Sequence, residues 1–161
     1  MKFARQTLLV VASSLLLFST ALTSGQSGSG PFAGLAGSWS GSGTIAMADG
    51  STEKIRCRAT YQAPNDGSTL RQTLRCASDS YKFDLSSDVV SEGGRITGTW
   101  SEASRGINGN LQGRAGSGRL AVVVEAPGFS ANLAVATQGN KQTVSIVSQA
   151  DIRNVSISLA R

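Results

Sequence analysis

The residue types that most often carry out chemistry in proteins are sparse in this chain of 161 residues. It contains no histidine, which excludes Ser-His-Asp and Cys-His nucleophile arrangements and most zinc sites. The carboxylates Asp79, Asp84, Asp88 and Glu92 follow one another along one segment, but without the D-x-D-x-D-G spacing of a calcium loop. We therefore expect no catalytic residue, no metal and no cofactor, and predict a protein that is not an enzyme.

The two cysteines, Cys57 and Cys76, are predicted to form a structural disulfide. A two-residue turn at Asp66-Gly67 joins two antiparallel strands and places Cys57 directly opposite Cys76. In this register they form a hydrogen-bonded pair, whose Cα atoms lie about 5.5 Å apart, a separation that a disulfide can span. Closing the loop between them should stabilise the fold by about 3 kcal/mol.

Apolar and polar residues alternate with a period of two through most of the chain after residue 37, which is typical of strands with one buried face. Turn signals recur about every ten residues, and no helical pattern is present. We predict an all-β fold: a small closed antiparallel up-and-down β-barrel of about 8–10 strands with one disulfide. The expected strands are Ser38–Ala48, Thr52–Gln62, Thr69–Ser78, Ser80–Val89, Arg95–Glu102, Gly106–Ala115, Arg119–Glu125, Phe129–Thr137, Gln142–Ser148 and Arg153–Ala160.

The first residues have the layout of a secretory signal peptide. Lys2 and Arg5 precede a mostly apolar run over Leu8–Leu22, which is short for a membrane-spanning helix; the alternative is an uncleaved N-terminal anchor. We expect cleavage after Ala21, or alternatively after Gly25, with no stable membrane span in the mature protein. The expected location is the periplasm, or alternatively the outside of the cell. The predicted organisation is a signal peptide at 1–21, a flexible Gly/Ser-rich arm at 22–36 and a β-barrel domain at 37–161.

Trp39 in the first expected strand and Arg161 after the last should meet at one barrel end, because closure pairs these two strands antiparallel. A guanidinium over an indole face contributes about 0.5–2 kcal/mol. Gly37, Trp39 and Arg161 resemble the pattern of the calycin superfamily of lipocalin-like barrels, which is a G-x-W and a cation packed across its Trp. That resemblance implies a ligand-binding barrel, although the long C-terminal helix of the lipocalins is missing here.

Two further resemblances concern the compartment and the N-terminal arm. The stretches IRCRATY from Ile55, LRCASDSYKFDL up to Leu85 and GTWSE from Gly98 resemble small exported alphaproteobacterial proteins of unknown function. The leader, the disulfide and the early Trp are also similar to periplasmic metalloprotease inhibitors, small barrels whose N-terminal arm enters the protease cleft. In that resemblance the segment Gln26–Ala36 is the arm.

The inward-facing aromatic residues Tyr61, Phe83 and Trp100 are the candidate ligand-binding residues. A barrel of about eight strands is either filled by side chains or holds one small ligand, and inward glycines either leave room or allow tight curvature. Our hypothesis is a non-enzymatic barrel that binds a small apolar or amphipathic ligand such as an envelope lipid. The alternative is a packed-core periplasmic interaction protein, either a protease inhibitor acting through its arm or a protein that docks an envelope component.

A basic outward face is expected on the hairpin that carries the cysteines. Its register places Arg58 opposite Arg75, and such like-charge pairs need a compensating anion: a neighbouring carboxylate, a lipid phosphate or an acidic partner. In the ligand hypothesis this face lies near an anionic headgroup; otherwise it only solubilises the protein. The overall charge of +5 comes without basic clusters interleaved with aromatics, so no nucleic-acid partner is expected. The face comprises Lys54, Arg56, Arg58, Arg71 and Arg75.

Overall fold

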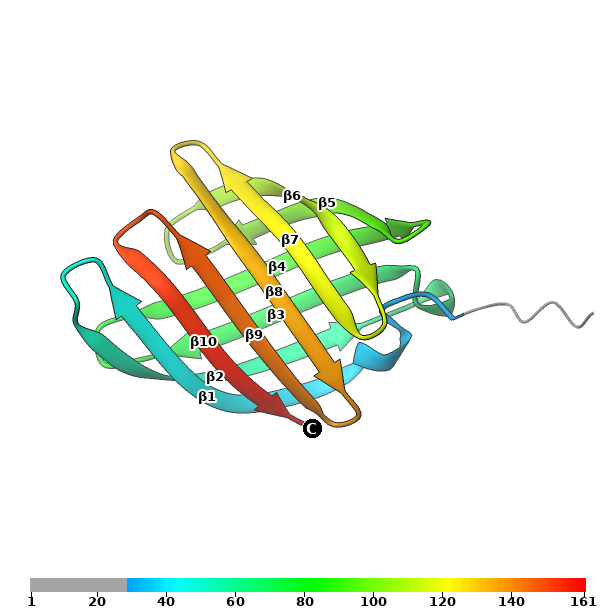
Figure 1. Ribbon diagram of the computed structural model, residues 1–161, viewed down its shortest axis with the longest axis horizontal. Coiled ribbons are helices and arrows are strands. Elements are labelled where there is room, and N and C mark those ends of the chain that lie inside the picture. The colour runs from blue at the N-terminus through cyan, green and yellow to red at the C-terminus, as the bar shows by residue number, and fades with distance from the viewer. Residues whose placement is uncertain (1–28) are drawn as a thin grey trace, which may run out of the picture.

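The computed structural model describes residues 29–161, which form one closed antiparallel β-barrel in which every strand pairs with its sequence neighbours and β1 pairs with β10 (Figure 1). The predicted all-β closed barrel is therefore confirmed. The predicted signal peptide at 1–21 and the first part of the arm lie outside the described residues. The ten strands are β1 (Gly37–Met47), β2 (Thr52–Gln62), β3 (Thr69–Ala77), β4 (Lys82–Glu92), β5 (Arg95–Glu102), β6 (Ile107–Gly116), β7 (Arg119–Ala126), β8 (Phe129–Gln138), β9 (Lys141–Ser148) and β10 (Ile152–Ala160).

The disulfide between Cys57 and Cys76 is present and joins β2 to β3. The register that places these residues opposite each other is the predicted one. The predicted hydrogen-bonded pair type is wrong, because the Cα atoms of Cys57 and Cys76 lie 4.1 Å apart, close to the spacing of a non-hydrogen-bonded pair. The predicted turn is wrong as well. A longer loop over 63–68, with a 3₁₀ turn η2 at Asn65–Gly67, replaces the predicted two-residue turn.

The N-terminal segment closes one end of the barrel, next to the C-terminus (Figure 1). A 3₁₀ turn η1 at Ala33–Leu35 buries Phe32 and Leu35 against the strands. Trp39 is 2% exposed and donates from Nε1 to the carbonyl oxygen of Leu35 at 2.8 Å. Arg161 places its Cζ atom 4.8 Å from the centroid of the Trp39 ring. We call Phe32, Leu35, Trp39 and Arg161 the end plug.

Inward glycines allow neighbouring strands to approach closely, and this bends the sheet into a barrel. A Cβ atom on Gly41 would lie 1.9 Å from the carbonyl oxygen of Ser158, and one on Gly113 would lie 2.0 Å from that of Ala121. Such separations are far below van der Waals contact, so these positions cannot carry a side chain without moving the backbone. Of the two roles considered for inward glycines, tight curvature is therefore directly supported.

Candidate functional site

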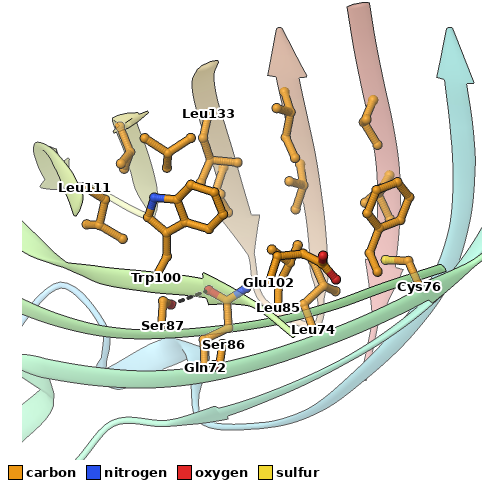
Figure 2. Close-up of a pocket in the computed structure, with 18 of the residues that line it drawn as sticks. Gln72, Leu74, Cys76, Leu85, Ser86, Ser87, Trp100, Glu102, Leu111 and Leu133 are labelled. Atoms are coloured by element: carbon orange, nitrogen blue, oxygen red, sulfur yellow. Dashed lines mark hydrogen bonds between the residues drawn. The ribbon is translucent and has the colours of Figure 1, made fainter. Parts of the chain in front are cut away.

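The barrel interior contains a cavity of about 470 Å³, so side chains do not fill it (Figure 2). It extends from Phe32 and Leu35 at the end plug to Met47 and Phe129 at the opposite end, which we call the mouth. Small-molecule sites in proteins typically have volumes of about 300–1,000 Å³ and mostly apolar walls. The wall includes the aliphatic side chains Ile55, Leu70, Leu74, Leu85, Val89, Ile96, Leu111, Leu120, Val122, Val124, Leu133, Val135, Val144, Ile146, Val155, Ile157 and Leu159.

Aromatic side chains gather toward the mouth. Tyr81 and Phe83 stack with their ring centroids 6.2 Å apart, and Trp100 meets Phe129 edge to face at 5.9 Å. Arg105 lies over the Phe83 ring, with Cζ 4.9 Å from its centroid. A ligand that enters here passes these four aromatic rings and the Arg105 guanidinium.

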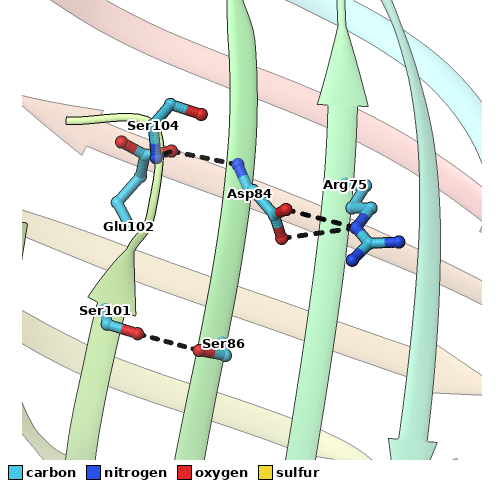
Figure 3. A network of polar contacts seen from close by, with 6 residues as sticks. All are labelled: Arg75, Asp84, Ser86, Ser101, Glu102 and Ser104. Carbon is cyan, nitrogen blue, oxygen red and sulfur yellow. Dashed lines mark hydrogen bonds and ion pairs between the residues drawn. The ribbon is translucent and has the colours of Figure 1, made fainter. Parts of the chain in front are cut away.

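Glu102 accepts hydrogen bonds from the backbone of the turn that carries Arg105, and Figure 3 shows its contacts with Asp84 and Ser104. Its buried carboxylate accepts hydrogen bonds from the backbone amides of Asp84 at 3.0 Å, Ser104 at 3.1 Å and Arg105 at 2.9 Å. Burial acts to raise the pKa of Glu102, but these hydrogen bonds outweigh it and lower the pKa below its usual value. Glu102 is therefore ionised, and its carboxylate oxygens accept hydrogen bonds from three backbone amides. This side chain holds the turn in place and is a poor candidate for a general acid.

The closed end of the cavity contains a satisfied polar pair. Tyr61 donates from its hydroxyl to Oε1 of Gln142 at 2.7 Å, and Nε2 of Gln142 donates to Oγ1 of Thr137 at 3.1 Å. Burial raises the pKa of Tyr61 to about 12, so its hydroxyl stays neutral under physiological conditions. The Tyr61 hydroxyl and both polar atoms of the Gln142 amide therefore each have a partner within the protein.

A second polar pair lies on the cavity wall between β3 and β4. Gln72 and Ser87 are cross-strand partners, and both side chains are half-buried. Ser87 donates from Oγ to Oε1 of Gln72 at 3.4 Å, a long and weak hydrogen bond. Figure 2 shows this pair with the indole of Trp100 nearby in the same cavity.

The three predicted ligand-binding residues, Tyr61, Phe83 and Trp100, line the same cavity. Tyr61 lies at the closed end and Phe83 near the mouth, while Trp100 donates from Nε1 to the carbonyl oxygens of Asn110 and Glu125. Sequence reasoning missed Gln72 and Arg105. Alternation along the strand places Gln72 on the inner face among apolar residues, and this pattern could have identified it from the sequence. Arg105 lies in a turn, where alternation does not predict which way a side chain faces.

The predicted basic face lies on the outer wall, away from the cavity. Arg71 pairs with Asp88 at 2.9 Å and Arg75 with Asp84 at 3.3 Å, so neighbouring carboxylates supply the compensating anions. Both pairs are exposed and contribute little to stability. The other members of the face, Lys54, Arg56 and Arg58, are also exposed, and none of the five lines the cavity. The expectation that this face lies near an anionic headgroup stays a prediction; the structure places the face outside the cavity wall.

Neither metal ligands nor a spanning helix is found in the part of the chain that the structure describes. No group of three or more His, Cys, Asp and Glu side chains in residues 29–161 could hold a metal ion. Among these same residues, no helix is long and apolar enough to cross a membrane.

Comparisons with known proteins identify the fold and nothing narrower. No family model matches the sequence, and no curated protein matches it. The crystal structure of Rv2717c from M. tuberculosis superposes with a TM-score of 0.64 at 14% identity, over 80% of this chain and 93% of that chain. The S-type phycobiliprotein lyase CPES from Guillardia theta gives a TM-score of 0.51 at 13% identity, over 80% and 86% of the two chains. These similarities show that the chain shares its overall barrel fold with these two proteins.

Proposed function

We propose that this protein is an exported, non-enzymatic carrier that binds one small apolar or amphipathic molecule inside its barrel. The cavity of about 470 Å³ with aliphatic walls is the observation that carries the proposal. Apolar surface that is left in contact with water inside a barrel is costly, and a ligand that covers it is stabilised by about 25 cal/mol per Å². A disulfide and a leader-like N-terminus support a periplasmic or secreted location.

The alternative of a packed-core interaction protein has less support. The interior is not packed, and the end of the proposed inhibitory arm is held in place. The backbone amides of Gly30 and Phe32 donate to the carbonyl oxygens of Asp66 and Gly67, and Phe32 is 0% exposed. Within residues 29–36 these contacts leave no free segment to enter a protease cleft. Because one barrel of similar fold is a phycobiliprotein lyase, the fold alone does not support a non-enzymatic function. The proposal that this chain is not an enzyme rests instead on its residue types, above all the absence of histidine from the sequence.

Titration with the uncharged fluorophore N-phenylnaphthylamine tests the proposal. Leu133 lines the cavity, while Asn132 precedes it on β8 and faces solvent. We expect saturable binding to the wild-type protein, binding at least tenfold weaker in Leu133→Trp, and unchanged binding in the matched variant Asn132→Trp. Absence of binding to the wild type, or equal binding by both variants, would contradict an interior site.

A further inference from the structure

Gln72 has an unused hydrogen-bond donor in the apolar cavity. Its Oε1 atom accepts from Ser87, but its Nε2 atom has no partner among residues 29–161. Gln142, the other glutamine on the cavity wall, instead uses both its oxygen and its nitrogen within the protein. Because no fully buried polar atom in the described chain lacks a partner, the Gln72 amide is open to the cavity space.

This conclusion does not depend on which way the amide of Gln72 is turned. In the orientation described, Ser87 donates to the amide oxygen and leaves both hydrogens on Nε2 free. In the reverse orientation Nε2 donates to Ser87, which leaves its second hydrogen and the hydroxyl hydrogen of Ser87 free. Both arrangements present at least one free donor, so a group that accepts a hydrogen bond satisfies the pair.

The charges on the cavity wall do not favour an anion. The charged lining residues are Glu102, Arg105 and Asp151, and Arg105 is already paired with Glu102 at 3.4 Å. The direct strand partners of Gln72 are Tyr61 and Ser87, and neither is charged. Burying a carboxylate beside them without a countercharge costs several kcal/mol, whereas a neutral carbonyl needs only the donor that Gln72 offers.

We propose that the ligand is an uncharged apolar molecule with a ketone, ester or similar acceptor oxygen, and that Gln72 donates a hydrogen bond to this oxygen. The inference rests on the proposed function and narrows its ligand class. Gln72 is thereby the residue that selects among apolar molecules of similar size, while the aliphatic wall supplies most of the affinity.

Displacement of N-phenylnaphthylamine by dodecane, a mid-chain dodecanone and dodecanoate tests this selection. We expect wild-type protein to prefer the ketone to the alkane by about three- to tenfold, the effect of one net hydrogen bond, and to bind the carboxylate more weakly than the ketone. Gln72→Leu should remove the preference for the ketone while it keeps the binding of dodecane. Thr73→Val, an exposed change on the same strand, should preserve the preference.

The outcomes separate this inference from the proposed function. Equal displacement by ketone and alkane in the wild type, or a preference that survives in Gln72→Leu, would overturn the role of Gln72 but leave the apolar site intact. Tightest binding of dodecanoate would overturn the uncharged ligand class. If the fluorophore does not bind and nothing displaces it, the proposed function fails together with this inference.

Discussion

Replacing Arg161 with alanine should loosen the closed end of the barrel by a measurable amount. The guanidinium makes a cation–π contact with Trp39, in which the Cζ atom of Arg161 lies 4.8 Å from the centroid of the indole ring. It also donates a hydrogen bond from Nη1 to the carbonyl oxygen of Ala36 at 2.7 Å. Arg161 is exposed, so we assign each of the two contacts about 1 kcal/mol. We therefore expect the free energy of unfolding to fall by about 2 kcal/mol in Arg161→Ala.

Thermal unfolding followed by circular dichroism measures this loss. For a domain of this size, 2 kcal/mol corresponds to a decrease in Tm of roughly 6–10 °C. Arg161→Lys retains a charge but has no planar group to lie on the indole, and should fall between the wild type and Arg161→Ala. Arg56→Ala on the exposed outer face is the control. If Arg161→Ala unfolds within about 1 °C of this control, the contact with Trp39 does not stabilise the barrel end.

Three further predictions concern curvature, the disulfide and pH. Gly109→Ala should destabilise the barrel by about 2–3 kcal/mol in urea unfolding, since its Cβ would lie 1.9 Å from a backbone oxygen, whereas Gly116→Ala has open space and should be neutral; equal midpoints would refute the steric argument. Replacing Cys57 and Cys76 together with alanine should cost about 3 kcal/mol under oxidising conditions, and this loss should vanish when the wild type is reduced. Because burial raises the pKa of Tyr61 to about 12, stability should fall as the pH rises from about 10 through 12, when the unfolded chain ionises first. Tyr61→Phe should lack that part of the decline, and identical pH profiles would contradict it.

The architecture was predictable because alternation with a period of two is a local property of the sequence. It defines which residues face inward on each strand, and β2 and β3 show it with Cys57 and Cys76 buried on the same face as Tyr61 and Leu74. The loop after β2 was not predictable in the same way. Its conformation depends on backbone hydrogen bonds from Gly30 and Phe32, which are distant in the sequence.

The candidate site was predictable only in part. The parity of Phe83 and Trp100 placed them on the inner face, but alternation does not tell how much space their side chains leave. The volume depends on how closely the strands approach at glycines such as Gly113, a property of the closed barrel. The free donor of Gln72 could be recognised only once Ser87 was known to be its partner across β3 and β4. The register between these two strands provides this information.

Native mass spectrometry of the protein purified without detergent from the cells that make it tests the central claim most directly. We expect a stoichiometric extra mass of a small uncharged molecule that organic extraction removes, and a clearly smaller fraction of protein carrying this mass in the Leu133→Trp variant. A bare protein mass before extraction, or an extra mass that Leu133→Trp retains in full, would contradict a ligand held inside the barrel.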